Sequence, residues 1–368
     1  MKTFTITFHH SNNYGAVLQA YALQQAIIGM GHENVIFEYP YEEHFYSGID
    51  FRHPVSAMRT ACLNLIKFLR RKPIRAREQS FRDFHKNRMN LTREYRSMDE
   101  LRNDYPPCDA LITGSDQVWR FSGNKEFIPA RFLDFGQPGI RKFSYAASIE
   151  KLNYTEEQKR QASEWLKDYY AISLREKSAA EYIRDVTGYD AQMVLDPIFL
   201  LDKEAWLKIA KPPRIKEKYI LCYQVQSSPT MQATVDYLKK KTGYKTVAVL
   251  PYTVKWLKTD YALFDVSPEE FLGLYSGAEM VVSASFHGTA FAHIFGKTVY
   301  ANVRDGSANR IIDIMNLFGV PEYCVASSED IIPPDRFDQQ AVQEKLRVER
   351  MRSLTYLKKC LSEESNAN

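Results

Sequence analysis

Apolar and polar residues follow two different periods in the first forty residues. Residues 2–8 alternate every second position, as a half-buried strand does, and residues 14–28 (YGAVLQAYALQQAII) place apolar side chains three and four apart, as a helix does. Gly29 and Gly31 end this helix, and residues 34–39 return to a strand-like pattern. Together the three segments predict a β-α-β unit.

Strand and helix patterns continue to alternate through the rest of the chain. Short apolar segments predict strands, and segments with apolar residues three or four apart predict helices. The expected strands are residues 109–113, 143–147, 171–174, 219–225, 246–250, 280–284 and 298–301, and the expected helices are residues 229–242, 268–276, 289–295, 310–318 and 338–360. Such alternation is typical of parallel sheets with helices on both faces, so we expect an α/β protein.

Length and proline positions divide the chain into domains. At 368 residues the chain is too long for one ordinary core, because most domains hold about 100 to 200 residues. Pro212 and Pro213 mark a break between two series of strand and helix patterns. We predict a Rossmann-like domain at residues 1–205, a second one at residues 206–335 facing the first across a cleft, and a helix at residues 336–361 that packs back on the first domain.

Composition favours a globular protein of a reducing compartment. Hydrophobic residues make up 45% and aromatic residues 13% of the chain, enough for a large core. The five cysteines are widely spaced and form no Cys-x-x-Cys pair, which argues against a disulfide framework and a zinc site. No apolar run is long enough for a signal peptide or a membrane span. We expect a cytoplasmic protein that holds no metal.

Basic residues are concentrated in one segment. Residues 59–96 contain twelve basic and three acidic residues, whereas the net charge of the whole chain is only +4. Apolar residues stand among the basic ones at roughly helical spacing, so this segment predicts a basic amphipathic helix. Such a helix either rests on an anionic membrane surface or a phosphorylated lipid carrier, or is a solvated helix over the core. Aromatic and basic residues are not interleaved as in RNA-recognition modules, so we expect no nucleic acid partner.

The most informative stretch for function is residues 279–296, EMVVSASFHGTAFAHIFG. An apolar strand leads directly into a Ser-Phe-His-Gly turn that opens a helix. This order places His287 at the carboxyl end of a strand, beside the backbone N–H groups of a helix N-terminus. Ligands of open α/β sheets bind at this edge, and helix N-termini favour anions. His287 is therefore the first candidate for a catalytic residue, with helix capping or core packing as the alternative.

Polar residues also follow two expected strands of the first half. Residues 109–113 lead into a loop of Gly-Ser-Asp-Gln, residues 114–117. Residues 171–174 end at Arg175 and Glu176. The ends of these two strands therefore place an acidic residue, Asp116, and a basic residue, Arg175, in the predicted first domain.

Seven segments together resemble the successive blocks of the polysaccharide pyruvyltransferase family. They are HHSNNYGAVLQAYALQ, DALITGSDQVW, SYAASIE, ISLREKSA, VLDPIFLL, VVSASFHGTAFAHIFGK and NRIIDIMNLFGV, in the family's order between about residues 6 and 320. The resemblance implies a GT-B-like architecture of two Rossmann-like domains. It also implies transfer of the pyruvyl group of phosphoenolpyruvate onto two hydroxyls of a sugar as a cyclic ketal, in the biosynthesis of a capsular or other surface polysaccharide.

Donor binding is expected to depend on arginine. Phosphoenolpyruvate, the donor substrate, carries a phosphate and a carboxylate, and a guanidinium binds each with two hydrogen bonds. Arg175 lies in the block that, by resemblance, contributes an arginine to the donor; an ion pair with Glu176 is the alternative. The other expected donor contacts are backbone groups of Phe286 and Gly288 and the side chain of Arg304 or Arg310. We place the donor on the second domain and the acceptor on the first, and expect no cofactor.

Acid-base chemistry completes the expected reaction. Transfer requires protonation of the methylene carbon, attack of a sugar hydroxyl and departure of phosphate. His287 can serve as the acid or base because imidazole titrates near neutral pH. We expect Asp116 to orient or deprotonate the acceptor hydroxyl, with helix capping as the alternative for Asp116 and Ser115. Asn13 and Tyr14 are expected to line the same cleft, although an N-cap role is simpler for Asn13.

Some residues and functions stay open at this point. His9 and His10 have no assigned role, and we expect His293 to be partly buried packing. We expect the acceptor to be a lipid-linked oligosaccharide, with peripheral contact at the inner membrane face. A GT-B-type nucleotide-sugar glycosyltransferase would share the two-domain architecture, and a non-catalytic capsule-assembly partner would use the basic segment as its anchor.

Overall fold

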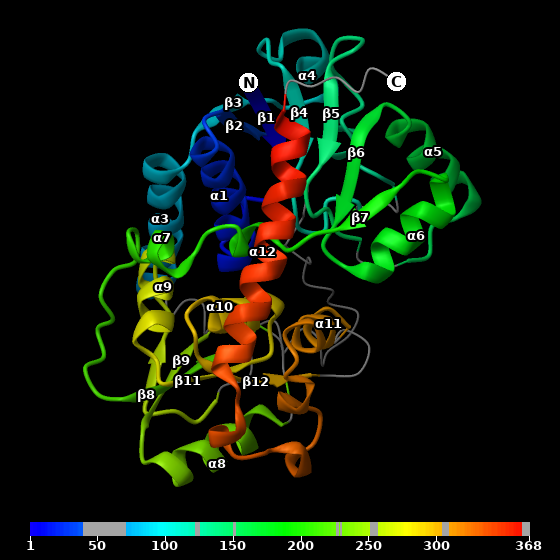
Figure 1. Ribbon diagram of the computed structural model, residues 1–368. Coiled ribbons are helices and arrows are strands. Elements are labelled where there is room, and N and C mark those ends of the chain that lie inside the picture. Colours follow the sequence, from blue (N-terminus) through cyan, green and yellow to red (C-terminus); the bar gives the residue numbers. More distant parts are fainter. Residues whose placement is uncertain are drawn as a thin grey trace, which may run out of the picture. The chain divides into compact units, whose positions relative to one another are not determined.

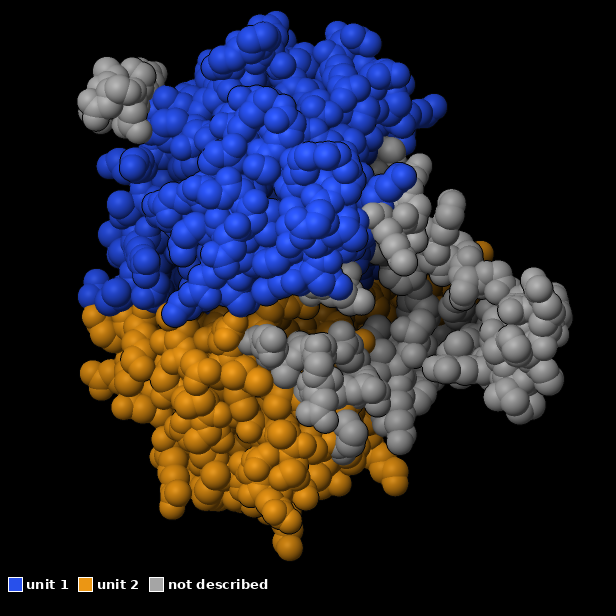
Figure 2. Space-filling view, turned by 90° about the vertical axis from the view of Figure 1, so that its right-hand side faces the viewer, with its two compact units in different colours: residues 1–43, 85–201, 347–368 blue, residues 44–84, 202–346 orange. Residues whose placement is uncertain are grey.

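The chain divides into two compact units. The computed structural model describes residues 1–39, 71–121, 126–149, 152–225, 228, 230–250, 257–303 and 309–362. Unit 1 consists of Met1–Glu43, His85–Leu201 and Arg347–Asn368, and unit 2 of His44–Phe84 and Asp202–Leu346, as coloured in Figure 2. Each unit is built on its own parallel sheet (Figure 1).

The sheet of unit 1 has the strand order β3-β2-β1-β4-β5-β6-β7, and each neighbouring pair is parallel. The strands are β1 (Lys2–Ile6), β2 (Glu33–Glu38), β3 (Leu91–Glu94), β4 (Ala110–Thr113), β5 (Arg141–Ser144), β6 (Tyr169–Leu174) and β7 (Ala191–Met193). Successive residues of a strand point to opposite faces. Ala110 and Ile112 of β4 accordingly join one buried cluster, whereas Leu111 joins another. Apolar side chains therefore cover both faces, as expected.

Helix α1 (Tyr14–Gly29) connects β1 to β2 and is buried on most of its surface. Its residues are apolar nearly all round, which is the pattern of a helix inside a core. The other helices of this half are α3 (Arg71–Arg88), α4 (Met98–Asp104), α5 (Glu156–Leu166) and α6 (Lys177–Thr187), with short 3-10 helices η1 (Pro129–Phe132) and η2 (Pro197–Phe199). Thr155 and Gln158 form a capping box that fixes the start of α5.

The last turns of the long helix α12 (Gln339–Leu361) belong to unit 1. Leu357 lies in a buried cluster with Ile27 of α1, and the two helices lie beside each other in Figure 1. The Tyr356 hydroxyl donates to the Ser144 carbonyl oxygen at 2.9 Å. A helix from the end of the chain thus completes a core begun by the first strands. The expected domain boundaries at residues 205 and 335 stay predictions.

The sheet of unit 2 has the order β10-β9-β8-β11-β12-β13, again parallel throughout. Its strands are β8 (Tyr219–Tyr223), β9 (Lys245–Val249), β10 (Tyr261–Leu263), β11 (Met280–Ser283), β12 (Thr298–Asn302) and β13 (Cys324–Val325). Its helices are α7 (Lys203–Leu207), α8 (Met231–Thr242), α9 (Pro268–Gly277), α10 (Phe286–Ile294) and α11 (Asn309–Phe318), followed by η3 (Pro321–Tyr323), η4 (Ser328–Asp330) and η5 (Pro334–Arg336). Two parallel α/β sheets confirm the expected pair of Rossmann-like domains.

The basic segment is described only in part. The first part of the expected basic helix, residues 59–70, lies outside the described residues, and helix α3 lies in the remaining part of the segment. Phe81 and Phe84 form the buried face of α3, while most of its basic side chains are exposed. Among the helices that the structure describes, none is both long enough and apolar enough to cross a bilayer.

Candidate functional site

The turn between β11 and α10 sits at the carboxyl edge of the unit 2 sheet. Strand β11 ends at Ser283, between β8 and β12. The Ser283 hydroxyl accepts from the Ser285 backbone N–H at 3.1 Å and donates to the Ser285 carbonyl oxygen at 3.2 Å. The Ser285 hydroxyl caps α10 by accepting from the Gly288 N–H at 3.5 Å. These bonds fix the first turn of α10 against the strand end.

His287 is the second residue of α10 and is half-buried. Its ring lies nearly perpendicular to that of Phe286, with centroids 5.1 Å apart. The structure therefore places His287 and Phe286 where the sequence predicts them, at a strand end and a helix N-terminus. The residue is half-buried, and its Nε2 atom is buried.

Gly288 is required by packing. A Cβ at this position would lie 2.2 Å from the Ser283 hydroxyl and 2.6 Å from the Tyr223 ring. Its N–H already donates to Ser285. The expected backbone contact of Gly288 with a donor substrate stays a prediction, but close helix-strand packing alone accounts for the glycine.

The other expected donor contacts are more distant in the chain. Arg310 is half-buried on α11, and Arg304 lies outside the described residues.

His293, in the last turn of α10, is fully buried, with 0% of the residue exposed, so the expectation of partial burial was wrong. Its ring packs edge-on against Phe318 at a centroid distance of 4.9 Å. Burial lowers the pKa of His293 to about 3.

Arg175, at the end of β6, lies among three carboxylates in unit 1. Its guanidinium donates to Glu176 Oε1 at 3.0 Å, to Asp196 Oδ2 at 2.9 Å and to Asp116 Oδ1 at 3.2 Å. Only 1% of the Arg175 side chain is exposed. Burial alone would lower the pKa of this guanidinium, but the charges of Glu176, Asp116 and Asp196 outweigh it and raise the pKa. The ion-pair alternative for Arg175 is therefore present in the fold.

Asp116 and Ser115 belong to the same network. The Ser115 hydroxyl donates to Asp196 Oδ2 at 3.3 Å. Asp116 adopts a positive φ of 70°, an uncommon conformation for a residue other than glycine. Its carboxylate accepts from the Gln117 backbone N–H at 2.9 Å as well as from Arg175. The side chain of Asp116 is 19% exposed, so its orientation is fixed while one side stays accessible.

Asn13 and Tyr14 start α1. The Asn13 side chain accepts from the Gly15 N–H at 2.9 Å, which is the N-cap role given as the simpler explanation. Tyr14 is only 2% exposed. Asn13 thus has a local structural role as an N-cap. The expected role of Asn13 and Tyr14 in lining a cleft stays a prediction.

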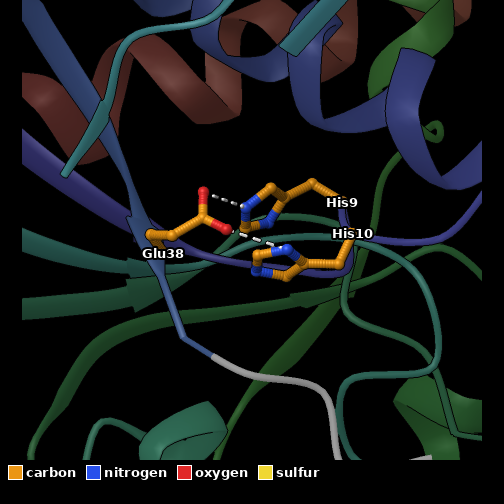
Figure 3. A group of neighbouring side chains, drawn as sticks. All are labelled: His9, His10 and Glu38. Carbon is orange, nitrogen blue, oxygen red and sulfur yellow. Dashed lines mark hydrogen bonds and ion pairs between the residues drawn. The ribbon is translucent and has the colours of Figure 1, made fainter. Parts of the chain in front are cut away.

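His9 and His10 meet Glu38 at the carboxyl ends of β1 and β2, a cluster that sequence reasoning missed (Figure 3). His10 Nδ1 lies 2.9 Å from Glu38 Oε1, and His9 Nε2 lies 3.5 Å from Glu38 Oε2. Burial lowers the pKa of His9. Burial would raise the pKa of Glu38, but its hydrogen bonds with His10 and His9 lower it. The predicted β-α-β unit was the available signal, because its two strands pair in parallel and their carboxyl ends lie side by side.

Comparisons with known proteins bear on the family and on the fold. The sequence model of a family described as polysaccharide pyruvyl transferase matches residues 13–301. No curated protein matches the chain. Among solved structures, a protein of Listeria monocytogenes assigned as a UDP-N-acetylglucosamine 2-epimerase is 10% identical, with a TM-score of 0.54 over 100% of this chain and 98% of that one.

A second similar structure is a glycosyltransferase of Streptomyces sp. SF2575, SsfS6. It is 14% identical, with a TM-score of 0.39 over 96% of each chain. At such identities only the fold is comparable, and the similarity to the Listeria protein supports a GT-B-like fold class for this chain.

Proposed function

The chain belongs to the polysaccharide pyruvyl transferase family, and we propose that it transfers the pyruvyl group of phosphoenolpyruvate to a sugar. In this reaction two sugar hydroxyls bond to the central carbon of the pyruvyl group, and phosphate leaves that carbon. One hydroxyl proton ends on the methylene carbon, which becomes a methyl group, and the other ends on the phosphate. The product is a cyclic ketal, and we propose that it decorates a capsular or other surface polysaccharide.

The observation that supports this function is the position of His287 in the first turn of α10. A helix N-terminus stabilises negative charge, so the leaving phosphate is favoured next to this turn. An imidazole exchanges protons near neutral pH. We therefore assign His287 to proton transfer at the methylene carbon or the phosphate oxygen, with Phe286 beside it and Arg310 as the candidate cation for the donor.

Asp116 is the proposed acceptor group of unit 1. Arg175 and the Gln117 N–H hold its carboxylate in one orientation while part of it stays exposed. A carboxylate held in this way orients a sugar hydroxyl by accepting its proton in a hydrogen bond. Because three carboxylates surround Arg175, we assign it to positioning Asp116 in preference to binding the donor anion.

The acceptor is proposed to be a lipid-linked sugar precursor at the inner membrane face. Six exposed basic residues of α3 support this proposal: Arg71, Lys72, Arg75, Arg82, Lys86 and Arg88. Each basic residue near an anionic lipid surface contributes about 1 kcal/mol of binding free energy. Helix α3 is therefore the described element best suited to bring the enzyme to such an acceptor.

Calorimetric titration of the purified chain with phosphoenolpyruvate, UDP and GDP tests the donor. Saturable binding of phosphoenolpyruvate alone is the expected result. Binding of a nucleotide in its place would make the chain a nucleotide-sugar glycosyltransferase, a function that the GT-B-like fold also permits. Absence of binding by all three would favour a non-catalytic role in polysaccharide assembly.

Replacement of His287 tests the proton-transfer role. His287→Ala should lower phosphate release from phosphoenolpyruvate in the presence of acceptor by at least about 100-fold, because a positioned acid-base group contributes about 10² to 10⁴ in rate. The matched control is His32→Ala, since His32 lies outside the proposed site and contacts the N-terminal amine. Circular dichroism should show the same fold for both variants. Retained turnover in folded His287→Ala would refute the role.

A further inference from the structure

We propose that His9, His10 and Glu38 hold a divalent transition-metal ion of the Zn²⁺ class, through one ring nitrogen of each histidine and the Glu38 carboxylate. The proposal concerns an ion site in unit 1 and does not depend on pyruvyl transfer. Two imidazoles and one carboxylate are a donor set that binds Zn²⁺ with three protein ligands and leaves a further position open.

The spacing of the three side chains suits such an ion. One ligand atom from each residue lies within 4.8 Å of the others. His10 Nδ1 is 2.9 Å from Glu38 Oε1, and His9 Nε2 is 3.5 Å from the other carboxylate oxygen, Oε2. Zinc bonds of about 2.0 to 2.2 Å at tetrahedral angles place neighbouring ligand atoms about 3.3 to 3.6 Å apart. Both rings turn toward the same carboxylate (Figure 3), so small side-chain movements would suffice.

The hydrogen bond of His9 gives a second, independent reason. His9 Nδ1 lies 3.1 Å from the Thr7 carbonyl oxygen, which only accepts, so Nδ1 carries the ring proton. In neutral His9 the lone pair of Nε2 then faces the Glu38 carboxylate, 3.5 Å away, which is also an acceptor. Two acceptors at this distance need a proton or a cation between them. A second proton on His9 would place an imidazolium on a residue that is 1% exposed, which is costly.

A metal ion satisfies both acceptors without charging the His9 ring. Ligating histidines commonly donate their other ring N–H to a backbone carbonyl, which fixes the tautomer and the ring orientation. The bond from His9 Nδ1 to Thr7 has this form. The cluster therefore has one ligand already oriented by the fold before any ion arrives.

Part of the cluster is exposed to solvent. The side chains of His10 and Glu38 are 29% and 24% exposed, whereas His9 closes the inner side. The cluster stands at the carboxyl edge of the parallel pair β1 and β2, the edge at which open α/β sheets bind ligands. An ion held here would bind water or an oxygen atom of a ligand at that edge.

The test is metal binding by the untagged full-length chain. After treatment with a chelator and dialysis, calorimetry with Zn²⁺ should show one equivalent bound, and Co²⁺ should give the visible absorption of a four- or five-coordinate site. His10→Gln and Glu38→Gln should each weaken Zn²⁺ binding by at least about 100-fold, since loss of even an outer-shell partner costs about 10- to 100-fold. His32→Gln, the matched control, should bind as the parent does.

Two results would overturn the proposal. The first is a parent chain that binds no stoichiometric Zn²⁺, which decides the question without any variant. The second is unchanged binding in folded His10→Gln and Glu38→Gln, as judged by circular dichroism. The titration uses neither phosphoenolpyruvate nor an acceptor, so failure of the metal site and failure of the proposed function are separate outcomes.

Discussion

At the residue scale, His293 places an ionisable ring in the apolar interior of unit 2. Neither of its ring nitrogens has a hydrogen-bond partner among the described residues. The neighbouring rings are those of Phe318 and Phe337. Burial in such a site favours the neutral imidazole over the charged imidazolium, because no described group replaces the hydration that the charge loses.

This burial makes stability depend on pH. Between the ordinary pKa of 6.5 and the lowered pKa of about 3, the unfolded chain binds a proton that the folded chain does not, so the free energy of unfolding falls as the pH falls. The contribution of His293 should reach about 2 kcal/mol at about pH 5, relative to pH 8. His293→Phe should remove it. Urea denaturation of parent and variant at both pH values measures the difference, and equal losses would contradict the prediction.

The candidate site could be predicted from sequence only where its signal is local. His287 follows its strand and opens its helix within one short segment, so the sequence locates it. The strand-end pattern points to Arg175 and Asp116 separately, but it does not predict their contact, which joins residues 59 positions apart. His9 and Glu38 are 29 positions apart and meet because their strands are adjacent. Pairings of this kind depend on strand order and register, which periodicity does not specify.

At the scale of elements, the packing of α10 on its sheet depends on Gly288. Gly288→Ala should lower the free energy of unfolding by about 1 to 3 kcal/mol, because the added methyl group would collide with Ser283 and Tyr223. Gly29, in the last turn of α1, is the matched control, since a Cβ there meets nothing within 4 Å. Gly29→Ala should be neutral or stabilise by up to about 1 kcal/mol. Chemical denaturation compares the two, and an undiminished stability of Gly288→Ala would refute this account of the turn.

Central strands were predictable and edge strands were not. The expected strands at residues 109–113, 219–225 and 280–284 correspond to β4, β8 and β11, whose residues are buried and apolar. Strands β3 and β10 are only four and three residues long, and none of their residues is fully buried. Apolar residues are frequent where a strand is buried, so a strand at the solvated edge of a sheet has a weaker apolar pattern in its sequence. β5 also ends earlier than expected, before the positive φ of Ala146.

At the scale of the whole molecule, unit 1 depends on a helix that is remote in sequence. Leu357 is 0% exposed and packs in the cluster that contains Ile27. Leu357→Ala should lower the free energy of unfolding by about 2 to 5 kcal/mol. Met351→Ala is the control on the same helix, because Met351 is 55% exposed and should change stability by less than about 0.5 kcal/mol. Equal effects of the two substitutions in urea denaturation would show that α12 is not part of this core.

Because unit 1 is built from three separate segments of the chain, its parts become available for folding at different times during synthesis. Strands β1, β2, β4, β5 and β6 leave the ribosome before the larger segment of unit 2, Asp202–Leu346, while residues 347–361 follow that segment. At about 5 to 20 residues per second, synthesis of the intervening residues 202–346 takes on the order of ten seconds. Throughout that interval the apolar face around Ile27 and Ile112 lacks its covering helix. We expect chaperones to shield this apolar face during synthesis, because unit 1 completes its folding only after residues 347–361 have been translated.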